Sequence, residues 1–338
     1  MMPMDWPNAA PAADHPVANP RGGAGGSRLF AICADFFMDD TDRLTDEERA
    51  LMGAMLRGLV EELVDELLTR LPALLAAQGE AERDQVYGRL RQSGLINRPS
   101  VVALLLRRAD EQQLGGRFGR EGDSFLSTLA GDSDGNIADA AMMLTIARGR
   151  RRDRFGRLSI EFDDLAAEEA VAIVQSIAAC LGLMFGDNHD QVLADAARKL
   201  IAEHDEGRRL EAAVVAVTRA LDVAGRLDDQ MVERMAGVKD AALLSAALSR
   251  RAGIDPDDGW AMFTGGEPML LARMAGCRRA SSATIIASFD PALGLGPPER
   301  AIDQFDRLDE PATDEAQRWL RLDPAFRAAR GALEKRHG

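Results

Sequence analysis

One amphipathic stretch at 45–71 constrains the fold of this chain more than any other part of the sequence. Thr45 and Glu48 have the spacing of a capping box, in which each side chain bonds the backbone amide of the other residue. Pro72 cannot continue a helix, because its ring removes a backbone donor and restricts the residue before it. The stretch therefore predicts one helix of about 26 residues, or roughly 39 Å.

The apolar positions of this helix form two rows that step by four residues. At 3.6 residues per turn, such rows drift by about 40° per step and wind around the helix. We therefore expect burial on more than one side, with several neighbouring elements packed against the helix. If Leu51, Leu59 and Leu67 are exposed instead, the rows form a dimer seam. Gly53 and Gly58 each destabilise a helix by about 1 kcal/mol relative to Ala, and we expect another backbone to approach closely at both.

The rest of the sequence continues this helical character in shorter segments. Ala, Leu and Arg are frequent, whereas aromatic residues make up only 5%, a composition that suits helices better than strands. No segment alternates with period two for long enough to predict a strand. The prediction is an all-α fold in which helix pairs stack as an irregular α-solenoid.

Composition divides the chain into four predicted parts. Residues 1–28 are rich in Pro, Ala and Gly and predict a disordered tail. A first helical group follows at 29–147, in which the apolar segment 29–38 is expected to dock onto the core. A polar, Arg-rich linker at 148–160 leads to a second helical repeat group at 161–338.

Charge and cysteine usage restrict the class of protein. The formal net charge of −14 argues against general binding of nucleic acids or anionic membranes. Cys33, Cys180 and Cys277 lie too far apart for a disulfide framework or metal motif and are expected to be reduced. Residues 1–28 lack the apolar segment of a signal peptide. The uncharged run 170–186 predicts a buried core helix rather than a membrane span. These patterns indicate a cytoplasmic protein without a cofactor.

Three stretches together resemble a known family. They read LTDEERALMGAMLRGLVEELVDEL at 44–67, RGRRRDRFGR at 148–157 and DDGWAMFTGGEPMLLARMAG at 257–276. In this order they are similar to the alphaproteobacterial domain of unknown function 2336 family (DUF2336). The resemblance implies an all-helical, HEAT-like repeat fold in a cytoplasmic bacterial protein. It implies no activity and no site residues.

An arginine island is the most unusual composition in this acidic chain. It consists of Arg148, Arg150, Arg151, Arg152, Arg154 and Arg157, opposed locally only by Asp153. As a site, it could bind a phosphate, a cyclic dinucleotide or an acidic partner surface, because arginine forms bidentate bonds with carboxylates and phosphates. As structure, it could place cations at a helix C-terminus and pair with the chain's own acids. The structural interpretation is favoured.

Two patterns that suggest catalysis have simpler explanations. Residues 131–135 match the G-x-S-x-G nucleophile motif at Ser133, but that chemistry needs a preceding strand. An inter-helix turn with Asp134 or Asn136 as helix cap is favoured. The same run lacks the glutamate that would close a calcium loop. The histidines show no metal-binding spacing; they are His15, His189, His204 and His337.

A cluster of methionine and aromatic residues recurs at helical spacing late in the chain. Core packing is the favoured interpretation, with a methionine-rich groove for a partner helix as the alternative. Its members are Trp260, Met262, Phe263, Met269, Leu270, Leu271 and Met274.

The sequence therefore predicts a binding function rather than chemistry. We expect a non-catalytic scaffold or regulatory module with a protein partner, and a homodimer stays open. The alternative is a sensor of a phosphorylated small anion or nucleotide that uses the arginine island. An enzyme comes third, because no catalytic set is assembled in the sequence.

Overall fold

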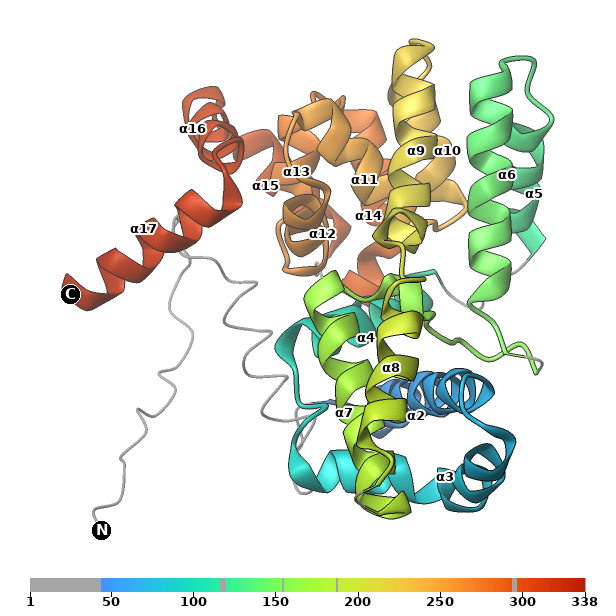
Figure 1. Cartoon of the computed structure of the whole chain (residues 1–338). Helices are drawn as coiled ribbons and strands as arrows, with labels where there is room; N and C mark the ends of the chain where they lie inside the picture. The colour runs from blue at the N-terminus through green and yellow to red at the C-terminus, as the bar shows by residue number, and fades with distance from the viewer. Residues whose placement is uncertain (1–43, 116–119, 154, 187, 294–296, 338) are drawn as a thin grey trace.

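The computed structural model describes residues 44–115, 120–153, 155–186, 188–293 and 297–337 (Figure 1). The predicted tail 1–28, the apolar segment 29–38, Cys33 and Arg154 lie outside these ranges. Within them, the regular elements are helices, which confirms the all-α prediction. One isolated antiparallel bridge joins Arg152 to Leu158.

The helices form two hydrophobic cores, which Figure 1 shows one above the other. The first core holds α2 (Asp46–Thr69), α3 (Ala73–Ser93), α4 (Pro99–Leu114), α7 (Ala167–Phe185) and α8 (Asp190–Ile201). The second begins with α5 (Arg120–Ala130), α6 (Gly135–Arg150), α9 (Leu210–Val223), α10 (Asp229–Gly237) and α11 (Ala241–Ala252). It is completed by α12 (Pro256–Thr264), α13 (Pro268–Met274), α14 (Arg279–Leu293), α15 (Pro298–Arg307) and α16 (Glu310–Leu320), and α17 (Pro324–His337) follows.

Helix α2 is the centre of the first core. The capping box is formed as predicted, because the Thr45 hydroxyl accepts from the Glu48 amide and the Glu48 carboxylate accepts from the Thr45 amide. Helix α2 packs against α3, α4, α7 and α8. Leu59 and Leu67 are 1% and 0% exposed, and Leu51 is half-buried. Burial on several sides is thus confirmed, and the dimer-seam alternative is wrong.

The glycine prediction for this helix is wrong. Among the residues that the structure describes, nothing would lie within 4 Å of a Cβ at Gly53 or Gly58, so no other described backbone approaches there. The close approach occurs instead at Gly79 on α3, where a Cβ would lie 2.2 Å from Leu68 and 3.0 Å from Phe185. Helix α3 continues through Gly79, and side chains of α2 and α7 pack against this position.

The two cores do not follow the predicted division of the chain. Helices α5 and α6 fall in the predicted first group but pack in the second core, α5 against α6 and α6 against α9. Helices α7 and α8 fall in the predicted second group but complete the first core around α2 and α3. The chain therefore passes between the cores three times, and the predicted linker 148–160 lies in only one of these crossings.

Helix α7 contains the uncharged run noted in the sequence. By length and composition alone, it is the one helix in the described ranges that could cross a membrane. Ile173, Val174, Ile177 and Leu181 are fully buried in the first core. This packing supports the interpretation as a core helix.

Candidate functional site

A network of buried charges joins the two cores. Arg108 on α4 is only 1% exposed, and its guanidinium bonds Glu111 at 2.9 Å and Glu211 at 2.7 Å. Glu211 lies in the first turn of α9, in the second core. Arg107 adds ion pairs to Glu211 at 3.2 Å and to Asp257 on α12 at 2.8 Å. The cores are thus connected by charge pairs in addition to the contacts of α4 with α11 and α14.

A second buried pair continues this network into the crossing segments. Arg151 follows α6, and its guanidinium lies 2.6 Å from Asp164 in the short helix η1 (Phe162–Asp164). Both side chains are almost fully buried. Asp164 also accepts from the backbone amides of Glu161 and Leu210 at 3.1 Å. This carboxylate therefore connects the end of α6, η1 and the start of α9.

The electrostatics of the network depend on pairing. Burial would raise the pKa of Glu211, but the positive charges of Arg108 and Arg107 outweigh it and lower the pKa to about 2. The pKa of Arg108 is raised despite burial, because Glu111 and Glu211 stabilise its charge. Nε of Arg108 is buried without a hydrogen-bond partner in the described part of the chain. An unsatisfied buried donor typically costs about 1–3 kcal/mol.

The structure separates the members of the predicted arginine island. Arg148 pairs with both carboxylate oxygens of Asp240 at 2.7 and 2.8 Å, and Arg151 pairs with Asp164. These two follow the structural interpretation, because they neutralise the chain's own acids at the end of α6. Arg150, Arg152 and Arg157 are exposed. The five described residues of the island therefore do not form one open cationic cluster, and Arg154 lies outside the described residues.

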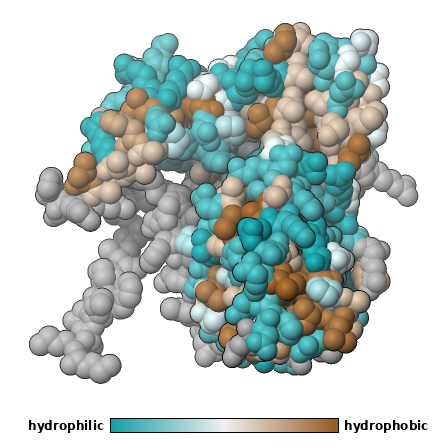
Figure 2. All heavy atoms as spheres, viewed as in Figure 1, coloured by the Kyte–Doolittle hydropathy of each residue, from teal (hydrophilic) through white to brown (hydrophobic). Residues whose placement is uncertain are grey.

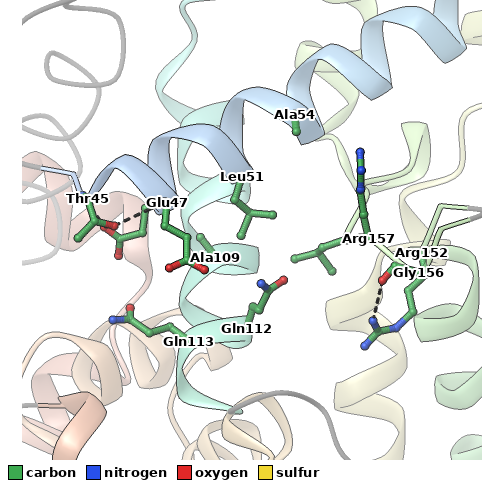
Figure 3. A pocket seen from close by; sticks show the side chains of 12 residues that line it. Thr45, Glu47, Leu51, Ala54, Ala109, Gln112, Gln113, Arg152, Gly156 and Arg157 are labelled. Atoms are coloured by element: carbon green, nitrogen blue, oxygen red, sulfur yellow. Dashed lines mark hydrogen bonds between the residues drawn. The ribbon is translucent and has the colours of Figure 1, made fainter.

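A large cavity with both polar and apolar walls lies beside the loop that follows α6. Its volume is about 740 Å³. Figure 3 shows Glu47 and Leu51 from α2 and Gln112 from α4 facing the loop residues Arg152 and Arg157. Arg152 donates to the carbonyl oxygen of Gly156 at 3.1 Å. The loop thus presents two of the predicted site residues to a cavity that belongs to the first core.

A smaller cavity adjoins it at the junction of the cores. Its volume is about 370 Å³. Both cavities are lined by Gln112, Arg152 and Leu158. Arg108 and the pair of Arg148 with Asp240 also line the smaller one. It therefore brings the buried charge network within reach of a small molecule.

A third cavity is the groove between α6 and α9. Its volume is about 480 Å³, and its walls are largely apolar. Met143 and Ile146 on α6 are 60% and 45% exposed, which is unusual for large apolar side chains. Small alanines face them from α9, and Arg150, Arg208 and Arg209 lie at one end. Figure 2 shows apolar surface over α6 and α9 at the upper right.

The G-x-S-x-G motif is a turn between two helices, as favoured from the sequence. It connects α5 to α6, and Asp134 caps α6 by accepting from the Asn136 amide at 2.9 Å. Asp132 pairs with Arg226 at 2.7 Å. No strand precedes Ser133 in the described part of the chain.

The histidines and cysteines in the described ranges lie apart from one another. His204 bonds the Leu165 carbonyl oxygen at 3.1 Å and packs on Phe162, whereas His189 precedes α8. Cys180 and Cys277 are buried as free thiols, and burial raises the pKa of Cys277 to about 11. Among the residues that the structure describes, no group of three His, Cys, Asp or Glu side chains could hold a metal ion.

The methionine and aromatic cluster belongs to the second core. Phe263 packs edge-on against Phe289, with ring centroids 5.3 Å apart. Leu270 is partly buried and packs against this core. The other members, Trp260, Met262, Phe263, Met269, Leu271 and Met274, are buried. The core interpretation is confirmed, and the exposed methionines lie instead on α6.

Sequence reasoning missed the carboxylates and the arginine that connect the cores. Val101, Leu105 and Arg108 fall on one face of α4, so Arg108 continues an apolar stripe. An arginine at a stripe position indicates a buried, paired charge. Nothing in the local sequence identifies its partner Glu211, which lies 103 positions away.

Comparisons with known proteins identify no relative of this chain. No protein-family model, no curated protein and no solved structure matches the chain.

Proposed function

We propose that this protein is a non-catalytic interaction module that binds an acidic, amphipathic helix in the groove between α6 and α9. The observation that carries the proposal is the exposed apolar face of α6 opposite the small side chains of α9. A helix binds such a groove through apolar anchors spaced at i, i+3, i+4 and i+7. Methionine adapts its shape to a partner, which suits Met143 to this role.

The arginines at one end of the groove favour a partner with acidic side chains. The side chain of Arg150 is exposed and forms no hydrogen bond or ion pair with the described residues. Nε of Arg209 is buried and has no hydrogen-bond partner among them. Within the described ranges, the Arg208 side chain forms two longer ion pairs, at 3.4 Å to Asp205 and 3.8 Å to Asp163. Acidic side chains of a partner would supply the missing acceptors.

The proposal also covers how the helices stack, the protein family and the cellular compartment. Consecutive helices pack as pairs, among them α5 with α6, α7 with α8 and α11 with α12, which favours an irregular HEAT-like α-solenoid. The resemblance to the DUF2336 family, and with it a cytoplasmic bacterial protein, rests on the sequence stretches alone. A homodimer, a membrane partner and general nucleic-acid binding are not part of the proposal.

A designed peptide tests the groove. We would label a 16-residue helical peptide with leucines at i, i+3, i+4 and i+7 and glutamates beside them, and measure binding by fluorescence anisotropy. Met143→Glu should weaken binding at least about tenfold, because it places a charge among the apolar anchors. Met142→Glu is the matched control, because Met142 is also exposed on α6 but does not line the groove.

Peptide charge provides the second control. A peptide with lysines in place of the glutamates should bind at least tenfold more weakly, because the groove ends in three arginines. Equal binding by the Met142 and Met143 variants, or tighter binding of the lysine peptide, would contradict the proposed function.

A further inference from the structure

The cavity of about 370 Å³ at the junction of the cores is distinct from the α6–α9 groove. Its walls come from α4 of the first core, from α5, α6, α9 and α11 of the second, and from the loop after α6. A molecule bound there would contact both cores at once. The volume suits a ligand of metabolite size, because small-molecule sites start at about 300 Å³.

The walls combine an apolar surface with directed polar groups. Leu126, Leu210 and Ala242 provide the apolar part, and Ser127 and Thr145 add hydroxyl groups. This composition is typical of sites that enclose the body of a small ligand and orient it through a few polar contacts.

The charged groups on the same walls favour an anion. Four arginines line the cavity against two carboxylates: Arg108, Arg148, Arg151 and Arg152, against Glu111 and Asp240. Asp164 and Glu211 do not line the cavity, but they pair with Arg151 and Arg108 from behind the wall and balance the two remaining positive charges. The side chains that line the cavity thus carry two more positive than negative charges, and the site including its buried partners is neutral, whereas the chain as a whole carries −14.

The hydrogen bonding of Arg108 also favours an anionic ligand, independently of the charge of the cavity. Its two terminal guanidinium nitrogens are held by Glu111 and Glu211, which fixes the orientation of the group. Its Nε is buried and has no hydrogen-bond partner among the described residues. Arg108 is one of the residues that line the cavity. Buried donors are almost always paired, so the unpartnered Nε indicates an acceptor that the described residues do not supply.

We propose that the junction cavity binds a small organic anion, a carboxylate or phosphate monoester on an apolar body. One anionic oxygen accepts from Arg108 Nε, Arg152 stands at the side shared with the larger cavity, and the apolar body lies against Leu126 and Leu210. The site does not depend on the α6–α9 groove, so either can fail without the other. Because the ligand contacts both cores, its binding should stabilise the folded chain.

Gly149 offers a way to fill the cavity without disturbing the fold. It lines the cavity from α6, and nothing would lie within 4 Å of a Cβ at this position. Gly149→Phe should occupy the space meant for the ligand. Gly149→Ala is the matched control, because it changes the helix backbone in the same way but adds only a methyl group.

The experiment uses the full chain with octanoate and phenyl phosphate as separate probes at low salt, measured by isothermal titration calorimetry and thermal shift. We expect at least one probe to bind, Gly149→Ala to bind it within about twofold of the parent chain, and Gly149→Phe to bind at least tenfold more weakly. The probe that binds distinguishes a carboxylate ligand from a phosphate ligand. Arg152→Gln should also weaken binding, whereas Arg157→Gln on the same loop, outside this cavity, should not.

Two results would overturn the proposal. If neither probe binds the parent chain at millimolar concentration, the unpartnered Arg108 Nε does not mark a ligand and the cavity is no site for an organic anion. If a probe binds the parent chain and Gly149→Phe equally, it binds elsewhere. Circular dichroism shows whether each variant is folded. If Gly149→Phe is unfolded, Arg152→Gln still tests the site, because Arg152 is exposed and its replacement should leave the fold intact.

Discussion

At the scale of single residues, the charges at the junction are the most consequential feature. An ion pair at the surface contributes little, because water screens it, whereas a buried charge without its partner destabilises the fold by several kcal/mol. Arg108 and Glu211 are of the second kind, since each is the other's partner across the boundary between the cores. Replacing either one leaves the remaining charge buried.

Glu211→Gln should lower the free energy of unfolding at pH 7 by about 2–4 kcal/mol, because Arg108 and Arg107 lose a buried counter-charge. The pKa of Glu211 is lowered from 4.5 to about 2 in the folded chain. Its stabilising contribution is therefore present above pH 4.5 and is lost as the pH falls towards 2. Urea unfolding at pH 7 and pH 3 should show the difference between variant and parent shrinking by about half or more.

A surface glutamate serves as the control for this pH dependence. Glu203 is mostly exposed and pairs with Arg70, so Glu203→Gln should change the free energy of unfolding by less than about 1 kcal/mol at both pH values. A Glu211→Gln effect that is as large at pH 3 as at pH 7 would show that lost packing, not lost charge, is responsible.

At the scale of helices, glycine has two opposite effects on the stability of this fold. On the exposed face of α2, Gly58 has empty space around its Cα and weakens the helix. At the contact between α11 and α12, a Cβ on Gly259 would lie 1.7 Å from the Ser249 hydroxyl, so only glycine fits. The amino acid is the same, and the neighbouring helix decides its effect.

Gly58→Ala should therefore stabilise the chain by about 0.5–1 kcal/mol, because it removes backbone freedom from the unfolded chain at no steric cost. Gly259→Ala should destabilise it by about 1–3 kcal/mol, because Ser249 is fully buried and cannot move aside freely. Denaturant midpoints of both variants test this pair. Shifts of the same sign would mean that packing at Gly259 is looser than its geometry indicates.

At the scale of the whole molecule, each core is built from two separate parts of the chain. Helices α5 and α6 bury Leu129, Ile137 and Leu144 against α9, while α7 and α8 return to cover α2 and α3. A cut at the predicted linker would therefore remove helices from both cores. The cores are continuous in space but not in sequence.

A fragment of residues 161–338 should consequently fail to fold, because α9 would expose the face that α6 covers and α7 would lose α2 and α3. We expect it to lack near-ultraviolet circular dichroism and a cooperative thermal transition. A fragment of residues 44–338 keeps all the helices of both cores and is the control. Cooperative melting of the shorter fragment would contradict this expectation and support the predicted division at 148–160.

Sequence and tertiary structure decided different things about this protein. Capping, helical periodicity and composition depend on neighbours within a few positions, so the sequence alone was enough to predict the all-α class, the capped α2, its burial on several sides and the turn at Ser133. The same local signals predicted a close approach at Gly53 and Gly58 and a division at 148–160, and both depend on contacts that no local pattern contains.

Only the tertiary structure placed Arg148 and Arg151 on internal carboxylates, brought Arg108 to Glu211, and left Met143 and Ile146 uncovered. The physical reason is that charge pairing and burial depend on distance in space. Residues on α4, α6 and α9 are far apart along the chain, and only the three crossings between the cores bring them together. Local periodicity therefore predicts helices, whereas the packing of those helices creates the sites.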